Sequence, residues 1–200
     1  MLITEVPFKS NGESARFFED HVEFSGQSMR YDEIVTLATN NSITIHTYFG
    51  IPMGRSFNGV ISLKMNNGRT HSINMNAMSM FGIPIIRNPR KNEKLFPPLY
   101  DAVYSIVARN MAQKYIDSIN GGTTVEIAGL NINSSEAISE SKNAVIINKE
   151  NYRECQISHG HGTTVAAVYD KPGDVLWSSS IWKNKNVLLV PYILDAVFGQ

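Results

Sequence analysis

Short stretches in which apolar and polar residues alternate, separated by turn residues, constrain this chain more than any other feature. One runs from Gly59 to Met65, and Asn66-Asn67-Gly68 leads from it into a second, Arg69 to Met75. An Asn-Gly pair between two alternating stretches is a strong local signal for a β-hairpin. Ser42 to Tyr48 also alternates, after a turn expected at Asn40-Asn41. The first half therefore predicts an antiparallel meander.

Two helices interrupt the strands. Apolar residues recur at spacings of three and four from Leu99 to Ile119, which predicts a long amphipathic helix. Pro97-Pro98 would lie at its start and Asn120-Gly121-Gly122 would end it. A terminal helix is expected to begin at Asn186 as its N-cap and to end at Gly199.

The order is thus strands, helix, strands, helix. We expect an α+β protein made of two antiparallel meanders, each closed by a C-terminal helix, over residues 1–120 and 121–200. Two hundred residues, 42% of them apolar, are enough for such a core.

Several short segments are similar to those of bacterial pleckstrin-homology-like (PH-like) proteins of uncharacterised function. The segments are Phe18-x-x-His21-Val22 with Met29 to Ile34, Ile127 to Leu130 with Asn151 to Glu154, and Trp182 to Leu189. The resemblance implies two tandem copies of a bent antiparallel sheet capped by a helix, and a role in binding proteins, peptides or phospholipid head groups. The basic cluster of classical phosphoinositide binders is absent, since only Ser25 to Ser28 stand between Phe24 and Met29.

Charge and composition exclude several classes of protein. Eighteen basic and eighteen acidic residues cancel, so binding of nucleic acid through bulk charge is not expected. The single cysteine, Cys155, cannot form an intrachain disulfide, and no apolar stretch reaches the roughly 18 residues of a transmembrane helix. Phosphate-binding and hydrolase motifs are absent too. We therefore expect a cytoplasmic protein without a cofactor and without catalytic activity.

Two sets of residues are candidates for binding a partner. The first is the densest basic cluster, Arg87, Arg90, Lys91 and Lys94, in the connection before the long helix. It suits phosphate or carboxylate groups, although an ordinary solvated linker also explains it. The second set lies in two apolar, Met-containing loops, and comprises Phe49, Met53, Met80 and Phe81. Apolar loops of this kind are typical of contact surfaces, or pack under a sheet.

Other polar residues carry weaker hypotheses. His159 and His161, two positions apart, could chelate a metal ion, whereas Cys155 lies about 13 Å from His159 on an extended strand. Cys155 is expected to be a core thiol rather than a nucleophile. Two acidic groups indicate a solvated face, namely Glu19-Asp20-x-x-Glu23 and Asp32-Glu33. An acidic docking surface is the less favoured interpretation of the same residues.

These observations favour a non-catalytic recognition module. It would bind a protein partner or a second copy of itself, through a sheet edge or the apolar loops, as an inhibitor or immunity-type protein could. Two alternatives stay open. One is a metal-dependent hydrolase using His159 and His161, and the other is binding of anionic lipid head groups through the basic cluster.

Overall fold

A computed structural model describes residues 1–9, 12–141, 143–160, 163–181 and 184–199, and it shows an α+β protein with antiparallel sheets. The chain forms two compact units, Met1–Val107 and Ala108–Gln200. In the described part of the chain, none of the helices combines the length and apolar character needed to cross a bilayer.

Unit 1 begins with a four-stranded meander in the order β1-β2-β3-β4. The strands are β1 (Leu2–Pro7), β2 (Ser14–Phe18), β3 (His21–Phe24) and β4 (Gln27–Arg30). Alternate residues such as Ala15, Phe17 and Val22 are fully buried, as expected for a sheet with one face on a core. A single turn of 3₁₀ helix, η1 (Tyr31–Glu33), leads out of this sheet.

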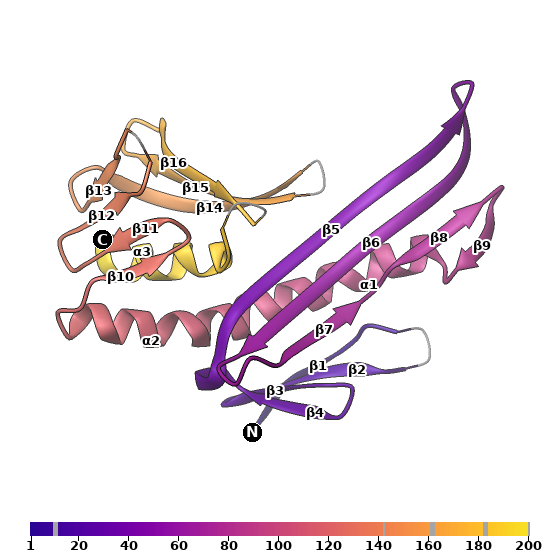
Figure 1. The fold of residues 1–200 in the computed structure, drawn as a ribbon, viewed down its shortest axis with the longest axis horizontal. Helices are drawn as coiled ribbons and strands as arrows, with labels where there is room; N and C mark the ends of the chain where they lie inside the picture. Colours follow the sequence, from indigo (N-terminus) through magenta and orange to yellow (C-terminus); the bar gives the residue numbers. More distant parts are fainter. Residues whose placement is uncertain (10–11, 142, 161–162, 182–183, 200) are drawn as a thin grey trace. The chain divides into compact units, whose positions relative to one another are not determined.

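The second sheet of unit 1 is dominated by two long strands, β5 (Ile34–Tyr48) and β6 (Ile51–Met65), which pair along their whole length (Figure 1). Both β7 (Thr70–Asn74) and β8 (Ala77–Met80) pair with β6, and β9 (Ile83–Ile86) pairs with β8. The predicted hairpin between β6 and β7 is confirmed, but only Gly68 of its turn has positive φ. The turn predicted at Asn40-Asn41 is wrong, because the cross-strand ladder continues through both residues.

A helical segment follows, made of α1 (Pro89–Ala102), a π-helical stretch η2 (Val103–Ala108) and α2 (Arg109–Asn120). It begins ten residues before the predicted Leu99, so the expectation that Pro97-Pro98 mark its start is wrong. Asn88 is the N-cap, and Pro89 occupies the first turn, where a missing N–H has no cost. The two later prolines lie on the exposed side of α1. Consequently Arg90, Lys91 and Lys94 belong to a helix and not to a linker.

α1 packs on one face of the second sheet. Phe96 of α1 is 2% exposed, and its ring meets that of Phe57 edge-on at 5.7 Å. Gly59 on β6 makes this contact possible, because a Cβ there would lie 2.7 Å from both rings. At the same level the Met75 N–H donates to the Gly59 carbonyl, so the pairing with β6 continues from β7 to β8 in one register.

Unit 2 repeats the order of unit 1 in a shorter form. Its first sheet is a meander of β10 (Val125–Ile127), β11 (Leu130–Ile132), β12 (Glu136–Ser139) and β13 (Ile146–Asn148). Its second sheet has the order β14 (Tyr152–Gly160), β15 (Thr163–Asp170) and β16 (Val175–Ser180). A 3₁₀ turn, η3 (Val187–Leu189), and the helix α3 (Val190–Phe198) close the unit.

The terminal helix differs from the prediction at its start. Asn186 is left-handed (φ 62°) and makes no side-chain cap, so the expected N-cap is wrong. Pro191 lies in the first turn of α3, where it is compatible with the helix. Val190, Ile193 and Leu194 are buried, so α3 supplies much of the core of unit 2.

Candidate functional site

Two hairpins in unit 1 end in the same unusual turn. Phe49-Gly50 joins β5 to β6, and Phe81-Gly82 joins β8 to β9. All four residues have positive φ, between 48° and 77°, which defines two-residue type I′ turns. Asn, Asp or Gly is favoured at the first position of such a turn, because a bulky side chain is strained there by about 1 kcal/mol or more. Phenylalanine is therefore unexpected at both tips.

Burial does not explain these phenylalanines either. Phe49 is 88% exposed and Phe81 is 68% exposed. Each ring is thus held in an unfavourable backbone conformation without being removed from water. Strained residues that the core does not require are concentrated at binding and catalytic sites, so the two turns point to a binding surface. We call Tyr48 to Ile51 and Met80 to Ile83 the hairpin tips.

The two tips are also related in sequence, a signal that the sequence analysis missed. Phe49-Gly50-Ile51-Pro52 and Phe81-Gly82-Ile83-Pro84 are identical tetrapeptides, and each is followed by an arginine three residues after its proline, Arg55 or Arg87. The apolar loops predicted at these positions are instead the ends of paired strands.

Apolar side chains continue from the tips onto the neighbouring strands. Nine large apolar residues in this part of unit 1 are more than half exposed: Ile43, Ile45, Tyr48, Phe49, Ile51, Phe81, Ile83, Ile85 and Ile86. Ile43 pairs with Phe57 and Ile45 with Arg55, so both isoleucines lie on the sheet face that carries α1. These exposed side chains lie on paired strands of one sheet, an arrangement typical of contact surfaces.

A groove of about 480 Å³ lies between the tips and the start of α1. Its apolar lining residues are Ile45, Pro52, Met53, Phe81 and Pro84. Its polar lining residues are Arg55, Ser79, Asn88 and Arg90, and Arg55 lies directly opposite Ile45 on the paired strand. The groove therefore combines apolar contact with cationic and hydrogen-bonding groups, as ligand sites in proteins do.

The charges around the groove are not balanced. Arg55 makes two hydrogen bonds, of 2.6 and 2.7 Å, to the carboxylate of Glu93 on α1, and this contact raises the pKa of the guanidinium. Glu93 is the first carboxylate after Glu33 in the sequence, so residues 34–92 contain none. Among the described residues, no ion pair involves Arg90, Lys91 or Lys94, which lie on the exposed side of α1. Glu93, which contacts the groove residue Arg55, is thus already paired.

The structure places the predicted binding residues in one region of unit 1. Met53, Phe81 and Arg90 line the groove, Phe49 occupies the neighbouring tip, and Met80 pairs with Gly54 beside it. Arg87 differs from the other cations, because its guanidinium donates to the Asn74 carbonyl at 3.0 Å. The basic and the apolar candidates, separate in the sequence analysis, therefore belong to a single surface.

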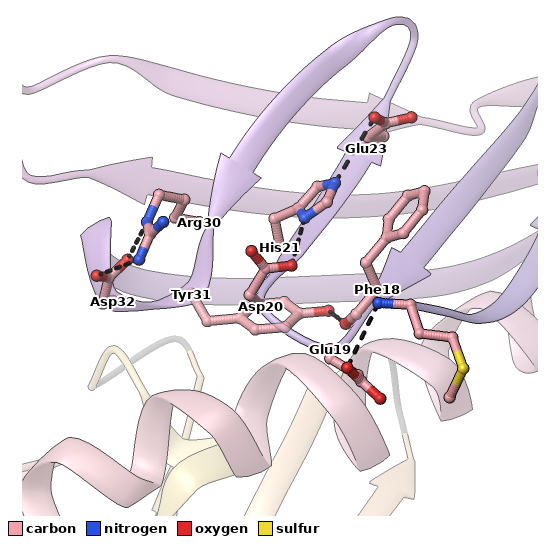
Figure 2. Close-up of polar contacts among 9 residues, drawn as sticks. Phe18, Glu19, Asp20, His21, Glu23, Arg30, Tyr31 and Asp32 are labelled. Atoms are coloured by element: carbon pink, nitrogen blue, oxygen red, sulfur yellow. Dashed lines mark hydrogen bonds and ion pairs between the residues drawn. The ribbon is translucent and has the colours of Figure 1, made fainter.

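The acidic residues near the N-terminus form a different kind of cluster (Figure 2). His21 stacks on Phe18 at 4.2 Å, its Nδ1 lies 2.7 Å from Asp20, and Nε2 lies 3.7 Å from Glu23. Arg30 makes two 3.1 Å hydrogen bonds to Asp32. The hydrogen bonds from His21 and Arg30 hold the pKa values of Asp20 and Asp32 below their ordinary range. These carboxylates are already paired within the cluster, which does not favour an open acidic docking surface.

A third contact of this cluster is structural. The Tyr31 hydroxyl donates to the Phe18 carbonyl at 2.8 Å, and burial raises the pKa of this phenol (Figure 2). It joins η1 to the end of β2 across the four-stranded sheet.

The metal hypothesis involves residues that the structure describes only in part. His161 lies outside the described residues, and of His159 only the backbone, in β14, is described. Within the described ranges, no three His, Cys, Asp or Glu side chains are grouped as a metal site would require. The Cys155 side chain is half-buried. Its removal from water, together with the nearby charge of Asp195, raises the pKa of the thiol to about 12. A thiol with so high a pKa is protonated at neutral pH, which does not suit a nucleophile.

Sequence comparison does not place this chain in a known family. No model of a protein family matches the sequence, and no curated protein matches it. The geometry of the hairpin tips and the groove is therefore the basis for a functional proposal.

Proposed function

We propose that this protein is a non-catalytic recognition module that binds a protein partner through the hairpin tips and the groove of unit 1. The observation that carries this proposal is the pair of exposed phenylalanines in strained type I′ turns. Neither the backbone nor the core benefits from an aromatic ring at these positions. A partner that covers the rings would remove their apolar surface from water and so offset the strain.

We also propose that the chain is a tandem of two PH-like units. In support, each unit has a four-stranded meander, then three consecutive antiparallel strands, and then a helix. Each also has a register shift at the start of the fifth strand, between Ile34 and Thr36 in unit 1 and between Tyr152 and Glu154 in unit 2. Such a scaffold is used for binding, although the fold alone does not define the partner.

Backbone pairing at the edge of β9 is a poor mode of binding here. The strand has four residues, contains Pro84 and has a register shift against β8. Short length, proline and bulges are the features that protect edge strands from adding another chain. We therefore place the contact on side chains of the tips and the groove rather than on the β9 backbone.

Site-specific photo-crosslinking in cells that naturally produce the protein tests this proposal. The crosslinking amino acid p-benzoylphenylalanine replaces Phe49 or Phe81, which keeps an aromatic ring at the tip. The matched control carries it at Ile146, an exposed apolar residue of unit 2. We expect both tip positions to give one discrete protein adduct, either another protein or a second copy, that the control does not give. Adducts to lipid alone, or no adduct specific to the tips, would contradict the proposal.

A further inference from the structure

We infer that the groove of unit 1 accepts an extended segment of the partner that combines apolar side chains with a carboxylate. This inference rests on the proposed function and specifies the chemistry of the partner. The lining of the groove and the charges beside it carry the inference.

The shape of the groove favours a short segment of chain. A volume of about 480 Å³ lies in the range that holds a compact ligand or a few side chains. Residues of the strands and of the start of α1 line it together, and the apolar ones are Ile45, Met53, Phe81 and neighbouring prolines. Apolar side chains of an extended peptide would be removed from water against these residues.

The charges favour an acidic group in the bound segment. Arg90 lines the groove, and Lys91 and Lys94 follow on the exposed side of the same helix. Glu93, the acid nearest in sequence, is held by Arg55 in a two-point ion pair. Among the described residues no carboxylate forms an ion pair with Arg90, so an acidic side chain of the partner would meet an unneutralised cation there. A carboxylate beside an arginine also gains charge-assisted hydrogen bonds.

A lipid bilayer fits the same surface less well. The exposed phenylalanines alone would suit insertion into a membrane together with basic residues. However, Arg55, Ser79 and Asn88 line the groove together with its apolar residues. Polar groups in that position would be costly in hydrocarbon and useful against a peptide backbone.

Selection from a display library of random twelve-residue peptides on the full-length protein tests the inference. The second bait is the charge-reversed variant Arg90→Glu/Lys91→Glu/Lys94→Glu, whose changed residues are all exposed. The matched control is Lys171→Glu/Lys185→Glu, which reverses two exposed charges of unit 2. We expect the wild type and the control to enrich peptides with Asp or Glu next to apolar residues. The charge-reversed variant should enrich peptides with Lys or Arg in the place of the acid.

Affinity measurements on the most enriched peptide complete the test. We expect at least tenfold weaker binding to the charge-reversed variant, and weaker binding to the wild type at higher salt. Enrichment of neutral or basic peptides, no enrichment, or equal affinity for both proteins would overturn the inference. So would sedimentation of the wild type with vesicles of 30% phosphatidylserine but not with neutral vesicles, if Phe49→Ser/Phe81→Ser abolished it. If tip-specific protein crosslinks are found but acidic peptides are not, the recognition function stands and only the acidic specificity is wrong.

Discussion

The two units follow the same order of strands and helix but differ in the hairpin at their centre. In unit 1, β5 and β6 have 15 residues each, whereas β14 and β15 of unit 2 have 9 and 8. Unit 1 also has the additional hairpin β8–β9 between its seventh strand and its helix (Figure 1). The described residues of unit 2 include only two exposed large apolar side chains, Ile146 and Val175, against nine on the extended hairpins of unit 1.

This difference shows which part of unit 1 its core does not need. We call this part, the outer ends of β5 and β6 with the β8–β9 hairpin, the extension. Unit 2 closes its core with short strands and α3, so the extra length in unit 1 is not required by the shared architecture. The fully buried part of β6 ends at Phe57; nearer the tip Arg55 still contacts Glu93 of α1, but the large apolar side chains become exposed. The extension is therefore a surface carried by the core of unit 1, and the two parts can be perturbed separately.

The largest expected effect comes from the core on which the extension rests. Phe96→Ala should lower the free energy of unfolding by about 3–5 kcal/mol, because it leaves a cavity beside Phe57. The corresponding change in the helix of unit 2, Phe198→Ala, should be similarly costly, since Phe198 is 1% exposed. Urea unfolding followed by circular dichroism measures both. A loss below 1 kcal/mol for Phe96→Ala would show that α1 does not anchor the long sheet.

A smaller loss of stability is expected from a change at Gly59, which lies against the contact between Phe57 and Phe96. Gly59→Ala places a methyl group 2.7 Å from the rings of Phe57 and Phe96, so these rings have to move. Overpacking of this kind costs about 1–3 kcal/mol. Gly82→Ala is the control, because it has open space around it and meets only the strain of its positive φ. Equal losses of stability in the two variants would contradict the close packing at Gly59.

In unit 2, the pH dependence of stability tests the surroundings of the half-buried Cys155 thiol. The pKa of Cys155 is raised from 9 to about 12 in the folded chain, so the unfolded state loses this proton first as the pH rises. The protonated thiol therefore contributes to the free energy of unfolding below pH 9. This contribution is lost between pH 9 and 12, with a decrease of about 1 kcal/mol by pH 10. Comparing wild type with Cys155→Ala at pH 8 and pH 10 isolates it. A pH dependence identical in the two proteins would mean that the thiol is not desolvated in the fold.

Much of the scaffold could be predicted from the sequence, because it depends on local patterns. Alternation and the Asn-Gly pair identified the β6–β7 hairpin, and the three- and four-residue spacing identified the long helix. The start of that helix was missed, since prolines usually mark a first turn and the earlier cap at Asn88 lies in a polar stretch that is typical of a linker. The continuous β5 was missed because its centre, Asn40-Asn41, is typical of a turn.

The candidate site was only partly accessible from the sequence. Phe49, Phe81 and Arg90 were each candidates, but their neighbourhood depends on the pairing of β6 with β8 and on the position of α1. The ion pair between Arg55 and Glu93 joins residues 38 positions apart, so no local pattern indicates it. The repeated Phe-Gly-Ile-Pro segment was the one signal in the sequence that could have linked the two tips.

The most direct test of the tips compares the double variant Phe49→Asn/Phe81→Asn with the wild type, in stability and in partner binding. Asparagine is favoured at the first position of a type I′ turn, so the variant should be more stable in urea by about 0.5–1 kcal/mol. The matched control is Ser25→Asn/Ala128→Asn, which changes the same position in the two other turns of the described residues that have positive φ at two successive positions, the second a glycine. With the photo-crosslinker at Ile45 in each protein, we expect the control to keep the partner adduct and the tip variant to lose it. A tip variant that unfolds more easily, or that still yields the adduct at the wild-type level, would contradict a surface built for binding.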